Sequence, residues 1–214
     1  MIQLWGRLSA FNVQKVLWAL YETGQPFEHI VVGGDAGGLN EPSFLLMNPN
    51  GRIPVLKDGD FVLWESHAIA QYLVDQYAPH LIHPDTRGRA EVRQWMDWSQ
   101  TELQPPFMDL FWGSVRMPKE KQDANFNRRA NQRTTQAMNI LDAHLAHSSY
   151  LAGENFSLAD IPAGTCLYRY FAMGEINRPD LPYLKRWYAH LCERPAYQKT
   201  VMLPFDDLIG KENF

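Results

Sequence analysis

The chain has 214 residues, of which 45% are hydrophobic and 21% charged, and its formal net charge is −4. This composition is typical of a globular protein of one or two domains and excludes collagen-like, low-complexity and disordered chains. The near-neutral charge argues against a dedicated nucleic-acid-binding protein. No 18-residue apolar stretch or secretory leader is visible. We therefore expect a cytoplasmic protein with no nucleic-acid or membrane partner.

Cysteine and histidine usage points away from disulfide and metal chemistry. Two cysteines, Cys166 and Cys192, are too few for a disulfide framework and form no Cys-x-x-Cys pair. Two His-x-x-His pairs, at residues 80–83 and 144–147, are not accompanied by carboxylate or cysteine ligands in a recognisable pattern. We expect no bound metal.

The first 78 residues predict alternating strands and helices. Strands are expected at short β-branched or aromatic runs, and helices where apolar residues recur at i, i+3, i+4 and i+7. In chain order we expect a strand at 2–5, a helix from Asn12 to Gly24, a strand at 27–32, a short helix at 41–47, strands at 53–57 and 61–64, and a helix from its N-cap Ser66 to Tyr77. Asp58-Gly59 predicts a type I′ turn, so the last two strands should form an antiparallel hairpin.

Residues 79–84 contain two prolines and predict a linker, and residues 85–214 are predicted to be helical throughout. The charge supports a division here, because residues 1–80 hold four basic and eight acidic side chains and so carry the whole surplus. Pro105-Pro106 should break or kink the first long helix of this half. Further helices are expected at about 122–147, after a reciprocal cap between Ser157 and Asp160, and between Pro182 and Pro195.

Three segments resemble motifs of the cytosolic glutathione transferases, in the order and at the spacing of that family. They are WGRLSAFNVQKV at 5–16, NPNGRIPVL at 48–56 leading into WESHAI at 64–69, and LAGE with FSLADI at 151–161. The sequence is most similar to the bacterial serine-type branch related to the theta and nu classes. The resemblance implies an α/β thioredoxin-like domain at residues 1–78 that binds glutathione, followed by an all-α domain at 85–214 that lines the pocket of the second substrate.

Two residues of the first motif are candidates for catalysis. A free thiol has a pKa of about 8.5, so only a few per cent is thiolate at neutral pH. A hydrogen bond donated to the thiolate lowers that pKa. Ser9 lies just before the first predicted helix, and the resemblance implies that its hydroxyl stabilises the glutathione thiolate. The amide of Asn12 is able to share or replace this role, and helix capping is the structural alternative for both residues.

The second motif supplies the residues that the resemblance assigns to glutathione binding. Ile53-Pro54 matches the cis-proline of the family, which presents the backbone of Ile53 to the cysteinyl backbone of glutathione. Glu65 and Ser66 match the pair that holds the γ-glutamyl end, with the carboxylate on its ammonium and the hydroxyl on its carboxylate. Arg52 could pair with the glycyl carboxylate, although a plain surface arginine fits it nearly as well. Glutathione would thus be a co-substrate, and no permanently bound cofactor is expected.

In this family the region after Pro105-Pro106 faces the second, apolar substrate. Phe107, Phe111, Trp112 and Arg116 are the candidates for that pocket, with packing in the helical core or a dimer interface as the alternative.

The resemblance implies a homodimeric enzyme that transfers glutathione to hydrophobic electrophiles and serves in detoxification. Two alternatives remain open from the sequence. One is a glutathione-dependent disulfide-bond reductase of the nu type, in which bound glutathione supplies the sulfur chemistry and no loop cysteine is needed. The other is a non-catalytic regulatory or binding protein on the same fold.

Overall fold

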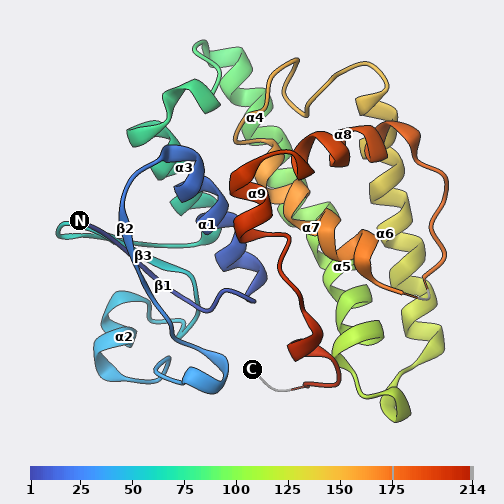
Figure 1. Cartoon of the computed structure of the whole chain (residues 1–214), viewed down its shortest axis with the longest axis horizontal. Coiled ribbons are helices and arrows are strands. Elements are labelled where there is room, and N and C mark those ends of the chain that lie inside the picture. Colours follow the sequence, from blue (N-terminus) through green and yellow to red (C-terminus); the bar gives the residue numbers. More distant parts are fainter. Residues whose placement is uncertain (175, 213–214) are drawn as a thin grey trace.

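The structure, a computed structural model, describes residues 1–174 and 176–212. A mixed sheet with its helices forms the first part of the chain, and a helical part follows it (Figure 1). The predicted fold class is therefore confirmed. Between the two parts, Pro79–Leu81 forms a single 3-10 turn. The boundaries of the domains and of the 79–84 linker stay a prediction.

Four short strands make the sheet, in the order β2-β1-β3-β4. They are β1 (Ile2–Trp5), β2 (Phe27–Ile30), β3 (Val55–Asp58) and β4 (Phe61–Trp64). β1 and β2 are parallel and joined through α1 (Phe11–Thr23), whereas β3 is antiparallel to β1 and β4 to β3. Helices α2 (Pro42–Met47) and α3 (Ser66–Tyr77) complete the predicted order. β3 begins two residues later than predicted because Pro54 has no N–H to donate to a ladder.

The hairpin between β3 and β4 is present, but the prediction of its turn is wrong. Asp58 pairs with Phe61, so the turn consists of Gly59 and Asp60 rather than Asp58 and Gly59. Gly59 has a φ of 63° and is the only one of the two with a positive φ. A positive φ at the first position alone is the pattern of a type II′ turn, whereas type I′ requires it at both.

The helical part begins at residue 86. Its helices are α4 (Thr86–Trp98), α5 (Gln104–Phe111), α6 (Ala124–Leu145), α7 (Asp160–Ala172), α8 (Pro182–Cys192) and α9 (Pro195–Thr200). Two π-helical segments, Ser99–Leu103 and Trp112–Arg116, follow α4 and α5 directly. No helix in the described ranges is long and apolar enough to cross a membrane.

Of the two expected effects of Pro105-Pro106, a break does not occur, because the chain stays helical from α4 through α5, and a kink stays a prediction. The π segment before α5 accommodates the two prolines, with the Gln104 N–H bonded to the Ser99 carbonyl five residues back. The missing proline N–H groups are thus absorbed by a change in the bonding pattern.

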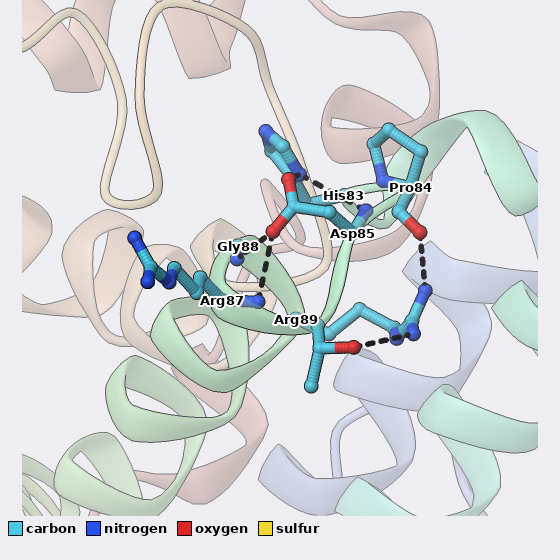
Figure 2. A network of polar contacts seen from close by, with 7 residues as sticks. His83, Pro84, Asp85, Arg87, Gly88 and Arg89 are labelled. Atoms are coloured by element: carbon cyan, nitrogen blue, oxygen red, sulfur yellow. Dashed lines mark hydrogen bonds and ion pairs between the residues drawn. The ribbon is translucent and has the colours of Figure 1, made fainter.

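Aspartate side chains cap the starts of α4 and α6, at Asp85 and Asp123. At α4, Asp85 Oδ1 accepts from the N–H groups of Arg87 at 2.8 Å and Gly88 at 3.1 Å, and His83 Nδ1 pairs with Asp85 Oδ2 at 2.6 Å (Figure 2). The His83 ring lies over Gly88, where a Cβ would come within 2.0 Å of it. This cap, four residues after the 3-10 turn, marks the start of α4.

The reciprocal cap before α7 is confirmed in one half only. The Ser157 N–H donates to Asp160 Oδ2 at 2.9 Å, as predicted. Ser157 Oγ, however, accepts from the Ala159 N–H at 3.3 Å rather than from Asp160, since α7 begins only at Asp160. Asp160 is fully buried and also accepts from Trp187 Nε1 at 3.1 Å. It therefore ties the start of α7 to α8.

Helix α1 lies between the sheet and the helical part. From Phe11 to Leu20 every residue except Asn12 is buried, because α1 packs against α3 and also against α7 and α9. Glu22, near its end, accepts two bonds from Arg194 at 2.8 and 2.7 Å. Gly24 ends the helix with a φ of 67°, as predicted. The first residues of α1 therefore lie where the two parts of the chain meet.

Candidate active site

The sheet register brings the predicted glutathione motifs to one edge. One row of the ladder joins Trp5, Val55 and Trp64. Because these neighbours are antiparallel, the chain continues past that row at the same end of the sheet with Gly6, Pro54 and Glu65. Segments that are almost 60 residues apart in the sequence thus meet beside the loop between β1 and α1.

Ser9 lies in that loop and is held by two arginines. Arg7 Nη1 donates to Ser9 Oγ at 3.2 Å, and Arg169 Nη2 of α7 donates to the Ser9 carbonyl at 2.7 Å. The N-cap of α1 is Ala10, and no side chain caps that helix, so capping does not explain Ser9. A hydroxyl that accepts from a guanidinium keeps its own proton to donate. The half-buried Ser9 hydroxyl is thus a donor beside the start of α1.

Asn12, the second residue of α1, begins a chain of partly buried polar groups. Its Oδ1 accepts from Gln104 Nε2 at 3.2 Å, and Gln104 Oε1 accepts from Lys15 Nζ at 2.5 Å. Lys15 Nζ also lies 3.2 Å from His67 Nε2 on α3. Burial lowers the pKa of Lys15 to about 8. Burial and the Lys15 charge lower the pKa of His67 to about 3, so its ring is neutral.

At the second motif, the Ile53–Pro54 peptide bond is cis, as predicted. Glu65 has a φ of 75°, the one positive value at a non-glycine residue in the described chain. Such strain collects at ligand-binding positions. The prediction that Ser66 is the N-cap of α3 is wrong. Glu65 takes that place without a side-chain hydrogen bond, and Ser66 is the buried first residue of the helix. The first N–H groups of α3 therefore face the sheet edge uncapped by a side chain. Arg52 is exposed.

The four candidates for the second-substrate pocket differ in exposure. Phe107 and Phe111 have no exposed surface, and Phe107 packs against Phe11 with ring centroids 5.8 Å apart. Arg116 is buried with its guanidinium 4.4 Å from the centroid of the half-buried Trp112 ring. The phenylalanines pack in the core here, and a role of all four in substrate binding stays a prediction.

Positive charge collects beside Ser9. Burial lowers the pKa of Arg7, of Arg116 and of Arg169, the last to about 10. The three guanidinium groups also act on one another, which lowers the pKa of Arg116 and Arg169 further, while the carboxylate of Asp207 opposes the shift in all three. A cationic surrounding favours an anion such as a thiolate.

Sequence reasoning did not assign site roles to Lys15, His67, Gln104 or Arg169. Lys15 and Arg169 each interrupt an otherwise largely apolar helix, a pattern that indicates a buried charge with dedicated partners. His67 and Gln104 carry no comparable signal, because they lie 52 and 89 residues from Lys15 in the chain. In the described ranges, no group of three or more His, Cys, Asp or Glu side chains could hold a metal ion.

A cis-proline at a thioredoxin-like sheet edge, beside a polar loop that the helical part holds, is the arrangement of glutathione-binding transferases. Comparison with known proteins agrees. Residues 4–81 match the family described as glutathione S-transferase, N-terminal domain, and residues 103–195 match glutathione S-transferase, C-terminal domain. The chain belongs to the cytosolic glutathione S-transferase superfamily and is related to its theta class.

Individual relatives cover nearly the whole chain. Glutathione S-transferase GstB of Escherichia coli (strain K12) is 39% identical over 207 residues, which span 95% of this chain and 99% of the relative. The theta class glutathione S-transferase of Xanthomonas axonopodis pv. citri, solved with glutathione bound, is 44% identical with a TM-score of 0.91, over 95% of this chain and 98% of that one. Glutathione S-transferase I from mais, solved with an atrazine glutathione conjugate, is 26% identical with a TM-score of 0.86, over 95% and 98%.

Proposed function

We propose that this glutathione S-transferase binds glutathione at the sheet edge and transfers its thiolate to hydrophobic electrophiles. The observation that carries the proposal is the convergence of the cis Ile53–Pro54 bond, the strained Glu65 and the Ser9 loop at one end of the sheet. A fold kept only for protein binding would not need these three features together.

Each charged end of the tripeptide has a matching group at this edge. The ammonium of the γ-glutamyl end would pair with Glu65, and its carboxylate with the Ser66 hydroxyl and the first N–H groups of α3. The backbone of Ile53 would pair with the cysteinyl backbone. Arg52, whose side chain is exposed, would reach the glycyl carboxylate.

The thiol would then lie against the β1–α1 loop. Ser9 would donate its hydroxyl proton to the sulfur, and the bond from Arg7 Nη1 makes that hydroxyl a stronger donor. The uncapped N–H groups at the start of α1 add positive potential. Lowering the thiol pKa by about two units would change a few per cent of thiolate at neutral pH into a majority. Asn12 is the second candidate donor.

An apolar electrophile would enter beside Trp112, and formation of the thioether bond would expel its leaving group to water. The bound atrazine conjugate of the maize relative supports this class of substrate, because atrazine carries a displaceable group on an aromatic ring.

The test measures glutathione binding, conjugation of an aryl halide and reduction of a small disulfide, for wild type, Ser9→Ala, Asn12→Ala and the exposed control Asn139→Ala. We expect binding and conjugation in wild type and the control, with kcat/KM reduced about tenfold or more in Ser9→Ala or Asn12→Ala. Lack of glutathione binding by wild type would overturn the proposal. Disulfide reduction without conjugation would favour the reductase alternative.

We also propose that the protein is a homodimer. A groove between β4, α3 and α4, lined in part by Phe61, Leu63, Tyr72 and Met96, supports this with an apolar surface. Light scattering after size exclusion measures the mass directly. A mass near 24.7 kDa at micromolar concentration would contradict it.

A further inference from the structure

We propose that Gln104 and Lys15 are positioning residues that decide which end of the Asn12 amide faces the glutathione thiol. The proposal rests on the proposed function and deepens it. The three side chains form one hydrogen-bonded line, from Lys15 Nζ to Gln104 Oε1 at 2.5 Å and from Gln104 Nε2 to Asn12 Oδ1 at 3.2 Å.

A side-chain amide has two ends of nearly equal shape and opposite chemistry, since the oxygen only accepts and the nitrogen only donates. Rotation by half a turn would exchange them at little steric cost. A neighbour that can act in only one sense is therefore needed to select an orientation. Protonated Lys15 is such a neighbour, because an ammonium donates and has no lone pair.

Lys15 is itself held firmly. It is 1% exposed, its Nζ lies 3.2 Å from His67 Nε2, and it lies 5.0 Å from the centroid of the Phe11 ring. Neutral His67 can accept a hydrogen bond at Nε2 and so uses a second ammonium proton. Because Lys15 is fixed in position and can only donate, the Gln104 side chain must turn its oxygen, the acceptor, toward Lys15.

The orientation then passes along the line. With Oε1 on Lys15, Gln104 presents Nε2 to Asn12, and this donor draws the oxygen of Asn12. The Asn12 Nδ2 group is left as the end that faces away from Gln104. An N–H donor there stabilises a thiolate, whereas an oxygen would repel it and favour the protonated thiol.

The place of Gln104 fits this role. It directly follows the π segment Ser99–Leu103, and its N–H makes the five-residue bond that ends the segment. Such local π segments are frequent at functional sites because they redirect a side chain. Gln104 also belongs to the helical part, whereas Lys15 and Asn12 belong to α1. The selection of the amide end therefore requires both parts of the chain.

Gln104→Glu is the decisive substitution. The carboxylate keeps the shape of the side chain and its bond from Lys15, but it can only accept, so Asn12 must turn its Nδ2 toward it and its oxygen toward the thiol. We expect the variant to raise the pKa of the bound glutathione thiol by about one unit and to lower kcat/KM at neutral pH about tenfold, with little change in the KM for glutathione. The thiolate absorbance across pH measures the pKa directly. Gln136→Glu, the same change at an exposed site on α6, is the matched control.

Two further variants separate positioning from general damage. In an Asn12→Ala background, Gln104→Glu should cause no further rise in the thiol pKa, since the amide through which it acts is gone. Asn12→Asp keeps the acceptor for Gln104 and presents only oxygen to the thiol, so it should raise the pKa more than Asn12→Ala does. This comparison stands even if Gln104→Glu fails to fold.

An unchanged thiol pKa in a folded, glutathione-binding Gln104→Glu variant would overturn the proposal, as would equal effects of Asn12→Asp and Asn12→Ala. A wild-type protein that binds no glutathione would overturn the proposed function and this inference together. Conjugation by wild type without these effects in the variants would overturn the positioning role of Gln104 and Lys15 and leave the proposed function standing.

Discussion

Gly6→Ala probes the point at which β1 leads into the Ser9 loop. The Gly6 N–H donates to the Ile30 carbonyl at 3.0 Å, and His29 Nε2 lies 2.7 Å from the Gly6 carbonyl, so the backbone is held on both sides. An added Cβ would lie 2.5 Å from Val13 Cγ2 and 3.1 Å from Val13 Cγ1. Val13 is fully buried in α1, where a β-branched side chain has one strongly preferred rotamer. Neither residue is able to move away cheaply.

Two costs add in this variant. Overpacking of a filled core costs about 1–3 kcal/mol. The φ of 154° at Gly6 lies outside the regions that side chains favour, which costs about 1–3 kcal/mol more. We expect Gly6→Ala to lower the free energy of unfolding by about 2–6 kcal/mol. Gly24→Ala is the control, because Gly24 has a φ of 67° and no atom within 4 Å of its added Cβ. That variant bears only a backbone cost of about 1–2 kcal/mol.

Urea denaturation followed by tryptophan fluorescence measures both variants, and a double-mutant cycle with Val13→Ala isolates the contact. Removing the Val13 γ carbons should make Gly6→Ala/Val13→Ala more stable than the sum of the single effects by about 1–3 kcal/mol. Additivity within about 0.5 kcal/mol would refute the steric reasoning. A Gly6→Ala effect no larger than that of Gly24→Ala would do the same.

Three further predictions follow from buried titratable groups. Burial lowers the pKa of Lys15 from 10.5 to about 8, so the unfolded chain binds more protons between these values and wild-type stability should gain as pH rises through them. Lys15→Met should lack this gain of about 3 kcal/mol, as urea denaturation at several pH values will show. Burial and the Lys15 charge hold the pKa of His67 at about 3 instead of 6.5. The unfolded chain therefore binds a proton at His67 that the folded chain does not, so the free energy of unfolding should fall as pH falls below 6.5. The imidazole resonances of His67 should not shift between about pH 5 and pH 8. Burial raises the pKa of the Cys166 thiol to about 12, so iodoacetamide should modify the less buried Cys192 first in the native protein, which peptide mass spectrometry detects.

The sequence predicted elements well where neighbouring residues decide the structure. Gly24 ends α1 because a left-handed residue there needs no partner elsewhere in the chain. The same local rules misplaced the turn at Gly59, since the pairing of β3 with β4 sets which two residues remain unpaired. They also predicted a break or kink at Pro105-Pro106, where the chain instead stays helical through a π segment whose last bond joins the Gln104 N–H to the Ser99 carbonyl.

The candidate site shows the same division. The cis bond at Ile53–Pro54 and the place of Glu65 could be predicted because contiguous motifs carry them. The Lys15–Gln104 bond could not, because its partners come from helices in different parts of the chain and neither residue type indicates the other. The burial of Phe107 and Phe111 could not be predicted either, because their helical spacing fits a core face as well as the wall of a pocket.

The helical part does more than cover the glutathione site, because it holds both candidate thiolate donors in place. Arg169 bonds the carbonyl of Ser9, and Gln104 bonds the amide of Asn12. The Arg169 guanidinium also lies 4.9 Å from the centroid of the Phe111 ring, next to the predicted second-substrate pocket. A substitution that moves Phe111 would therefore move Arg169 and, through it, the Ser9 loop. If the proposed roles of the Ser9 loop and of the Phe111 region hold, substrate range and thiol activation are physically coupled, because one buried arginine contacts both.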